Sequence, residues 1–405
     1  MTFEPTALGE QSIFFNNLRK PVTRSDRERG VYPYYGAAGI QDYVAEYLFD
    51  GKYILVGEDG TVLSNFEYPV VQRVAGKFWV NNHAHVIRPL DMADLDFLYY
   101  SLVGTRVVNL VTGAVQPKLS MTNLKSLEII WPKDPKTRRT IGHILNLLDE
   151  KIQANKQISK TLEDIAQTIF KSWFIDFDPV KAKMAGGKPV GMDAATAALF
   201  PDSMADSELG LIPEGWEVEE FGSVNNLLMG QSPPGSTYNT EGVGLPFYQG
   251  KTDFGSRFPK HRVHCTAGNR TAKVGEILVS VRAPVGDLNQ AIEECVIGRG
   301  VASALHKSGS QAYSFSLLTS LKPKLGFYNG QGTVFGAINR FDFQSMKLVE
   351  PSPEVLTVFD QTTKPLNDQI RNLFLETGSL IHLRDSLLPL LISGKLQIPE
   401  EMLVS

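Results

Sequence analysis

Basic and amide side chains lie beside glycines, small residues or turn residues at several points in the second half of this 405-residue chain. Glycine lets a backbone approach a ligand closely. Arginine and lysine are the usual partners of guanine, as glutamine and asparagine are of adenine. The residues in this setting are Gln249, Lys251, Arg282, Arg299 and Arg340. Their types fit contact with nucleic-acid bases, although surface solvation alone would account for any single one.

Arg282 and Arg299 have the most suggestive surroundings. Each follows a strand-like apolar segment, Ile277–Val281 or Cys295–Ile297, and each enters a loop of small residues. A strand end followed by such a loop leaves a long cation exposed. The alternative is that both arginines pair with nearby acids, Asp287 for the first and two glutamates for the second. Exposed pairs of that kind contribute about 1 kcal/mol at most, so they would not hold the arginines away from a phosphate or a guanine.

The first half offers a comparable set of polar loop residues. These candidates are Tyr35, Asn81, Asn82, His83, Gln116 and Lys118. For the two asparagines an alternative stays open, because asparagine also shapes turns through its side chain.

Catalytic motifs are missing from the sequence. Ser232-Pro233-Pro234 resembles the tetrapeptide with which amino-methyltransferases grip a base, but Gly235 stands where the stacking aromatic belongs. No glycine-rich loop has the spacing of a P-loop, and no serine elbow or paired-histidine motif occurs. The acidic pair Glu58-Asp59 lacks the second ligand cluster of a nuclease. We therefore expect no catalytic residues and no cofactor.

The two cysteines, Cys265 and Cys295, lack zinc-finger spacing, so no metal site is predicted. Free thiols, an N-terminus unlike a signal peptide, and a longest late apolar stretch of only Leu387–Ile392 predict a cytoplasmic protein without a membrane segment. The formal net charge of −4 does not favour nucleic-acid binding. Residues 245–347, however, contain 13 Lys and Arg against 6 Asp and Glu, a local excess of seven positive charges.

An internal duplication with a period near 218 residues organises the chain. Two segments, Thr137–Phe174 and Glu354–Ile392, carry apolar residues every seven positions, with a companion series four positions later. The first segment has Ile141, Leu148, Asn155, Leu162 and Ile169, and the companions Leu145, Ile152, Ser159, Ala166 and Trp173. At an offset of 218 the second has Phe359, Leu366, Leu373, Leu380 and Leu387, and the companions Thr363, Ile370, Thr377, Arg384 and Leu391. Spacings of three and four over several heptads predict two helices that pair as a coiled coil.

Pro365 falls inside the second helical segment, so we expect either a kink there or a helix that begins near Lys364. Upstream of the helices the repeat continues. The segment from Gly113 resembles the one from Gly332, and both contain a short strand, Leu127–Trp131 or Met346–Glu350. YPYYG at Tyr32 matches LPFYQG at Leu245, and KYILVGEDG matches GEILVSVRAPVG. Each half is therefore predicted to be a globule of short strands and glycine-rich loops followed by one long helix.

The predicted fold class is α+β, with the two helices forming an antiparallel coiled coil between two similar globules. A parallel arrangement is less direct but not excluded. The predicted segments are a first globule (1–136), its helix (137–175), an exposed linker (176–213), a second globule (214–352), its helix (353–393) and a C-terminal tail (394–405). Two similar heads at a fixed separation suit a ligand that repeats along a line, as DNA does.

Three segments resemble signatures of the specificity subunits of Type I restriction–modification systems: IFKSWFIDFDPVKAKMAGG, IPEGWEV and LRDSLLPLLISGKL. The resemblance covers nearly the whole chain. It implies a non-catalytic DNA-binding subunit whose two globules are target-recognition domains, each reading one half of a bipartite asymmetric site in double-stranded DNA. It further implies helices that act as a ruler for the gap and dock two modification subunits, which carry the methylation chemistry, with restriction subunits added. Base-reading residues cannot be inferred from the resemblance.

Two other classes of function stay open at this point. A self-contained DNA methyltransferase or nuclease would need a cofactor or metal motif that the sequence lacks. A structural adaptor that holds two protein ligands with its two globules would need no chemistry at all.

Overall fold

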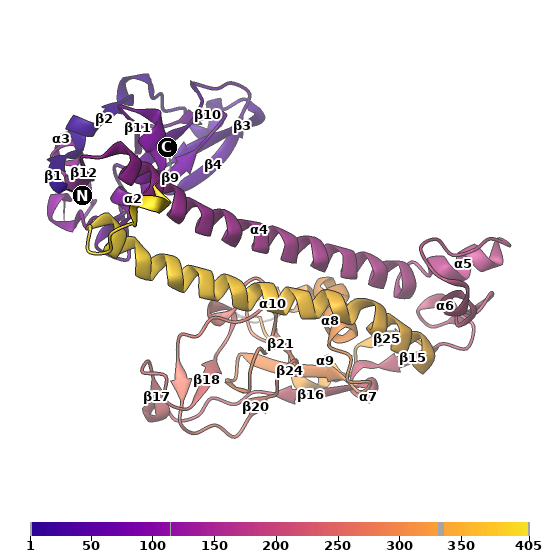
Figure 1. Ribbon diagram of the computed structural model, residues 1–405. Helices are drawn as coiled ribbons and strands as arrows, with labels where there is room; N and C mark the ends of the chain where they lie inside the picture. The colour runs from indigo at the N-terminus through magenta and orange to yellow at the C-terminus, as the bar shows by residue number, and fades with distance from the viewer. Residues whose placement is uncertain (1, 114, 331–335, 404–405) are drawn as a thin grey trace. The chain divides into compact units, whose positions relative to one another are not determined.

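The computed structural model describes residues 2–113, 115–330 and 336–403, and these divide into two compact units. The first unit comprises Met1–Ala154 and Thr377–Ser405, and the second comprises Asn155–Glu376. Each unit therefore holds one globule and a part of each of the two long helices (Figure 1). The first residues of the loop predicted from Gly332 fall within 331–335, which lie outside the described residues.

The first globule is built from short strands. They are β1 (Phe3–Ala7), β2 (Ser12–Phe14), β3 (Arg29–Gly36), β4 (Gly39–Val44), β5 (Phe49–Asp50), β6 (Tyr53–Gly57), β7 (Leu63–Ser64), β8 (Tyr68–Pro69), β9 (Val71–Val74), β10 (Lys77–Val80), β11 (Ala84–Pro89) and β12 (Glu128–Pro132). Its helices are α1 (Leu8–Gln11), α2 (Leu95–Val103) and α3 (Met121–Lys125). One sheet has the order β2-β11-β6-β9 and another β4-β3-β10-β5, while β1 pairs with β12 and β7 with β8.

The second unit begins with α5 (Asp178–Met184), α6 (Ala194–Ala198), β13 (Met204–Ser207) and β14 (Gly210–Pro213). Its globule has β15 (Glu217–Glu220), α7 (Phe221–Val224), β16 (Asn225–Met229), β17 (Tyr238–Asn239), β18 (Leu245–Tyr248), β19 (His264–Cys265), β20 (Thr271–Ala272), β21 (Ile277–Ser280), β22 (Leu288–Gln290), β23 (Cys295–Ile297), β24 (Val301–His306), α8 (Gln311–Gly326), α9 (Arg340–Gln344) and β25 (Lys347–Glu350). The sheets have the orders β16-β24-β21-β22 and β17-β19-β18-β23-β20, with the pairs β15-β25 and β13-β14.

The two globules share their topology, which confirms the duplication seen in the sequence. The four-stranded sheet β2-β11-β6-β9 corresponds to β16-β24-β21-β22, and β1-β12 corresponds to β15-β25. Each globule also contains one parallel pair, β3 with β10 and β18 with β23. The matching sequences KYILVGEDG and GEILVSVRAPVG contain β6 and β21, which are completely buried and occupy the same place in their sheets. Apolar, β-branched runs of this kind form strands that are covered on both faces.

Two 40-residue helices follow the globules, α4 (Pro135–Phe174) and α10 (Pro353–Ile392) (Figure 1). Each of the twenty seam positions predicted from the heptads is buried or half-buried. In the first unit Ile141 of α4 belongs to the same core as Leu391 of α10. In the second unit Trp173 of α4 lies 5.7 Å from Phe359 of α10, ring centroid to centroid. The start of one helix therefore lies beside the end of the other in both units, so the pairing is antiparallel, as predicted.

Helix α10 runs from Pro353 through Pro365 to Ile392 as one element. The expectation that this helix could begin near Lys364 is therefore wrong. The hydroxyl of Thr363, two residues before the proline, donates to the carbonyl of Phe359 at 2.7 Å. Packing of the apolar seam on both sides of Pro365 outweighs the loss of one backbone hydrogen bond.

The segment expected to be an exposed linker is largely folded. It contains α5, α6 and two paired strands, and the side chains of Val180 and Phe200 are buried. Phe200 lies 5.2 Å from Trp173, ring centroid to centroid, and thus joins the core of the second unit. The stretch around Gly186 fits the expectation, since residues 185–188 are exposed. The segment is rich in glycine and lysine, and this composition predicted a linker although a few aromatic residues anchor the segment in the core.

Candidate nucleic-acid interface

A cleft of about 570 Å³ opens on the second globule, and four of the five residues predicted there line it. They are Gln249, Lys251, Arg282 and Arg299. Gln249 and Lys251 follow β18, and Arg299 follows β23. These two strands are parallel neighbours, with Tyr248 opposite Ile297, so their C-terminal ends meet. The topology therefore brings together residues that are 50 positions apart in the sequence.

Backbone contacts join the remaining loop to this cleft. Arg282 follows β21, and the amide of the preceding Val281 donates to the carbonyl of Gly300 at 3.0 Å. Gly300 itself has no room for a side chain, because a Cβ there would lie 2.2 Å from the carbonyl oxygen of Gln249. Any other residue at this position would push the loops of Gln249 and Arg299 apart. Here a glycine is required for close backbone approach.

The two arginines of the cleft are as accessible as the sequence suggested. Both side chains are exposed, and among the described residues neither guanidinium forms an ion pair. Two of the acids proposed as alternative partners are engaged elsewhere. Asp287 lies 2.9 Å from the ammonium group of Lys251, and Glu293 lies 3.1 Å from the imidazole of His261. Arg282 and Arg299 are therefore available to an anionic or base ligand.

Below the cleft, a buried carboxylate holds the loop of Gln249 in place. Asp253 is 1% exposed and accepts the backbone N–H of Gln249 at 2.8 Å. It also forms an ion pair with Arg262 at 2.7 Å. Both interactions leave the carboxamide of Gln249 pointing away from the core, where it is exposed. Asp253 thus supports a loop of the cleft without lining the cleft itself.

Two residues that the sequence did not suggest as DNA contacts also line the cleft, Ser232 and Thr252. The hydroxyl of Ser232 accepts the backbone N–H of Arg299 at 3.2 Å. In the sequence, Ser232 stood out only as part of a methyltransferase-like motif. Its position next to two prolines, which mark a loop, was the local signal that could have identified it.

Arg340 lies apart from this cleft. It is the first residue of α9 and lines a separate depression of about 370 Å³ with Asn226 and Lys307. The fifth predicted residue of the second globule is thus exposed but does not share a surface pocket with the other four.

In the first globule, three of the six predicted residues gather around the acidic loop after β6. His83 pairs through Nδ1 with Asp59, and Lys118 lies 3.6 Å from Glu58. The carbonyl of Asn82 accepts a hydrogen bond from Arg19, whose guanidinium also pairs with Glu58 at 2.6 Å. The cationic and imidazole groups of this surface are therefore tied to carboxylates.

The other three predicted residues differ in exposure. Asn81 is 2% exposed, and its side-chain oxygen accepts the backbone N–H of His83 at 2.8 Å, so it shapes the loop, which was the alternative considered for it. Tyr35 is half-buried against Phe78, and burial raises its pKa. Gln116 is exposed.

The described residues contain no cluster of three or more His, Cys, Asp or Glu side chains arranged to hold a metal ion. Within the same ranges, no helix combines the length and apolar character needed to cross a bilayer. Cys265 and Cys295 are buried and unpaired.

Comparisons with known proteins agree with this architecture. The profile of the Type I restriction modification DNA specificity domain matches residues 3–164. The MjaX type I restriction enzyme specificity subunit of Methanocaldococcus jannaschii is 32% identical over 307 residues, which cover 74% of this chain and 65% of that relative. The HindI specificity subunit of Haemophilus influenzae is 24% identical, with 86% of this chain and 84% of the relative covered.

A crystal structure of the S subunit of a Type I restriction–modification system from M. genitalium matches 98% of this chain and 97% of its own length. The TM-score is 0.64 at 14% sequence identity, so this likeness concerns the fold. The duplicated globules, the two long paired helices and the sequence matches agree. The chain belongs to the family of Type I restriction–modification specificity subunits, whose members determine DNA target recognition and are themselves non-catalytic.

Proposed function

We propose that this chain reads a bipartite, asymmetric site in double-stranded DNA, with one target-recognition globule for each half-site. The observation that carries this proposal is the cleft of the second globule, where two exposed arginines without ion pairs meet Gln249 and Lys251. Arginine binds the O6 and N7 atoms of guanine in a bidentate manner, and glutamine binds adenine similarly. The cleft thus offers base-reading and phosphate-binding groups on one surface.

A segment exchange tests whether the globules read DNA independently. Residues Trp216–Leu348, which run from the second globule's first strand to its last, would be replaced by the matching segment of a relative. We expect the methylated motif, mapped in cells with the complete system, to change in one half and keep the other. A motif that changes in both halves would contradict the modular assignment, and a motif that does not change would contradict DNA reading by this globule.

The second part of the proposal is that α4 and α10 set the gap between the half-sites. Four residues inserted after Asn155 would lengthen α4 by about 6 Å and rotate the remainder of the helix by roughly 40° beyond a full turn. We expect the motif to keep both half-sites and to gain one or two base pairs of gap, at about 3.4 Å per base pair. An active complex with the original gap would show that the helices do not determine this distance.

The third part is that the helices dock two modification subunits, to which restriction subunits are added, in the cytoplasm. Both long helices carry exposed apolar residues on their outer faces. Ile158 and Ile165 are exposed on α4, and Leu383 and Leu390 are exposed on α10. Ile165 and Leu383 are related by the 218-residue repeat, so the same apolar contact is available twice. Two equivalent contacts fit two copies of one partner.

Single substitutions distinguish two docking sites from one. Ile165→Asp and Leu383→Asp each place a charge on one helix face without disturbing the seam. We expect native mass spectrometry to find one modification subunit lost with either variant and both lost with the double variant. Full stoichiometry in all three would contradict docking at these faces. Lys160→Asp, at another exposed position of α4, is the control.

A further inference from the structure

A buried arginine connects the second globule with both long helices. Arg257, in the loop between β18 and β19, is 5% exposed. One guanidinium nitrogen donates to the side-chain oxygen of Asn367 on α10 at 2.8 Å and to that of Gln290 at 3.1 Å. Its Nε lies 3.9 Å from the carboxylate of Glu163 on α4. The guanidinium thus contacts a strand of the globule and both helices at once.

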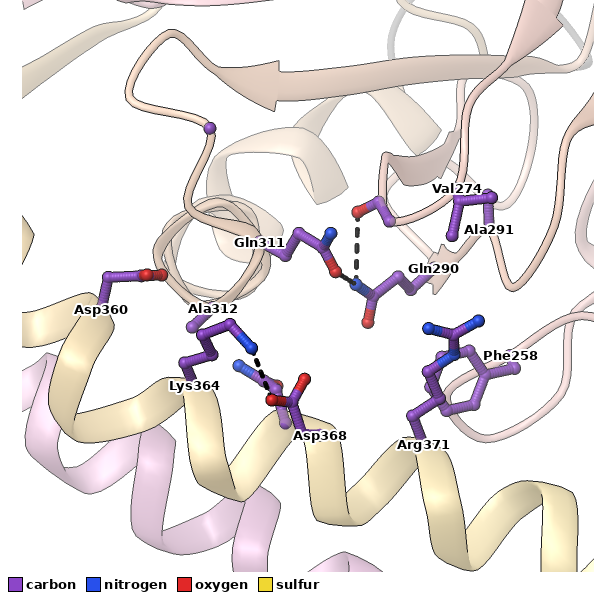
Figure 2. A pocket seen from close by; sticks show the side chains of 13 residues that line it. Phe258, Val274, Gln290, Ala291, Gln311, Ala312, Asp360, Lys364, Asp368 and Arg371 are labelled. Carbon is purple, nitrogen blue, oxygen red and sulfur yellow. Dashed lines mark hydrogen bonds and ion pairs between the residues drawn. The ribbon is translucent and has the colours of Figure 1, made fainter.

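The surroundings of Arg257 hold it in one position. Its guanidinium carbon lies 3.3 Å from the ring centroid of Phe315 on α8. Figure 2 shows Gln290 hydrogen-bonded to Gln311, which fixes one acceptor of the arginine. Burial lowers the pKa of Arg257 to about 10, and burial also raises the pKa of Glu163. A cation that is desolvated to this degree is retained only where its hydrogen bonds are specific.

The first globule has a corresponding link made by a different residue. Arg73 of β9 pairs with Asp149 of α4 at 3.4 Å and also donates to Asn146. Asp149 in turn pairs with Arg384 of α10 at 2.6 Å. Here too a guanidinium from the globule reaches α4 directly and α10 through one shared carboxylate.

The two links connect equivalent positions. On the helices, Asp149 and Asn367 are separated by the 218 residues of the repeat. On the sheets, Arg73 stands opposite Ile54 of β6, and Gln290 stands opposite Ile277 of β21. Because β6 and β21 correspond, Arg73 and Gln290 occupy the same place on the edge strand. The second half has glutamine there, and Arg257 spans the distance from this glutamine to the helix.

We infer that Arg73 and Arg257 are positioning residues, which fix each recognition globule on its helix pair and thereby set the spacing at which the two half-sites are read. Both duplicated halves contain such a connection, although a residue at a different position makes it in each. The inference rests on the proposed reading of a bipartite site. It concerns the spacing of that site and not its sequence.

Of the two links, the one made by Arg257 has the weaker electrostatic stabilisation. Arg73 lies 2.9 Å from the carboxylate of Asp96 and has Asp149 beside it. Arg257 has two amide acceptors and a single carboxylate at 3.9 Å. Charge-assisted hydrogen bonds to carboxylates are the stronger kind. Arg73 is therefore expected to make the stronger of the two links.

The test measures binding of the assembled complex to duplexes with the cognate gap and with gaps one base pair shorter or longer. Arg257→Met keeps the contact with Phe315 but removes the link. We expect the preference of the wild-type complex for the cognate gap to fall about tenfold, as when one hydrogen bond to a charged group is lost, with both half-sites still required. Asn367→Leu removes the same link from the helix side and covers the case in which the first variant does not fold.

Arg371→Met is the matched control. Arg371 lies one turn further along α10, lines the same cavity as Gln290 and Asn367, and is exposed (Figure 2). It should leave the gap preference unchanged. Two results would overturn the inference. Equal weakening of binding at every gap length would indicate that the link has a merely structural role. An unaltered gap preference in both link variants would indicate that the link has no role. A wild-type complex without any gap preference would instead contradict the proposed function.

Discussion

The ends of two equivalent strands, β6 in the first globule and β21 in the second, carry opposite charges. After the shared Ile-Leu-Val of the strand, the first globule continues to Glu58 and Asp59, and the second continues to Arg282. Glu58 lies within 3.6 Å of Arg19, His85 and Lys118. Among the described residues, Arg282 forms no ion pair. The groups around Glu58 therefore form a closed network of charges in the first globule, whereas Arg282, within the described ranges, belongs to no such network in the second.

This difference shows which parts of a duplicated fold are constrained. The strands themselves are buried in both globules, so their apolar residues are retained because each contributes on the order of 1.5–3 kcal/mol by burial. The loops after these strands lie on the surface, where substitution costs little stability. Two copies of one scaffold can therefore present different chemistry to different half-sites. The comparison predicts that the unpaired cations of the second globule contribute more to binding than the paired ones.

The largest effect is expected from the double variant Arg282→Ala and Arg299→Ala. Each arginine should contribute about 1–3 kcal/mol, or about 2–6 kcal/mol together if the two act independently. Binding of the assembled complex to the cognate duplex would be measured over a range of salt concentrations. A base-reading arginine relaxes one position of the motif, whereas a phosphate-binding one weakens all sequences and lowers the salt slope by about 1.

Arg340→Ala serves as the comparison variant, because Arg340 has the same charge but lines a separate depression. We expect it to have a smaller effect than either cleft arginine. Wild-type affinity and salt slope in the folded double variant would show that the cleft is not the DNA-binding face. A steep salt dependence of the wild type would also exclude an adaptor that binds only proteins.

A smaller effect is expected from the paired lysines, one in each globule. Lys118 lies 3.6 Å from Glu58, and Lys251 lies 2.9 Å from Asp287, with both side chains more than half exposed. Because each ammonium group already has a carboxylate neighbour, its replacement by alanine should cost less binding free energy than replacement of an unpaired cation, by at most about 1 kcal/mol. Asp287→Asn, which releases Lys251, should strengthen binding. If either lysine matters as much as Arg282, the distinction between paired and unpaired cations fails.

The sequence predicted the parts of the fold that depend on local periodicity. Heptad spacing predicted both helices and their seam, and the repeated Ile-Leu-Val predicted β6 and β21. It also predicted four residues of the cleft, because strand ends with small-residue loops have a recognisable composition. These features are encoded by neighbours close to one another in the sequence.

Features that depend on distant contacts could not be predicted in this way. Arg257 and Asn367 are 110 residues apart, and no local pattern distinguishes this arginine from an exposed one. The ion pairs that occupy His83 and Lys118 likewise involve residues more than 20 positions away. The burial of Phe200 in a segment of linker-like composition has the same origin. In each case tertiary packing decided the outcome.

The smallest effect concerns the pH dependence of the closed network in the first globule. His85 is fully buried behind Glu58. Burial, with smaller contributions from the nearby Arg19 and Lys118, holds the pKa of His85 below its ordinary value of about 6.5. Glu58 and the bond to Leu119 oppose this lowering. Its Nδ1 accepts from the side-chain amide of Asn16 at 2.8 Å, and its Nε2 donates to the carbonyl of Leu119 at 2.8 Å. Only the neutral imidazole can accept the bond from Asn16, whereas the bond to Leu119 can form in either protonation state.

A lowered pKa in the folded state means that the unfolded chain takes up a proton first as the pH falls. The stability that neutral His85 provides is therefore complete above about pH 6.5 and is lost as the pH drops from there through the folded pKa, with a slope of at most about 1.4 kcal/mol per pH unit for one proton. Hydrogen exchange of the β11 amides in the full chain, at pH values from about 7.5 to about 5.5, would measure this loss. His85→Gln can retain both hydrogen bonds without titrating, so it should flatten the profile. An equally steep profile in that variant would assign the pH dependence to other groups and leave the closed network without a titrating member.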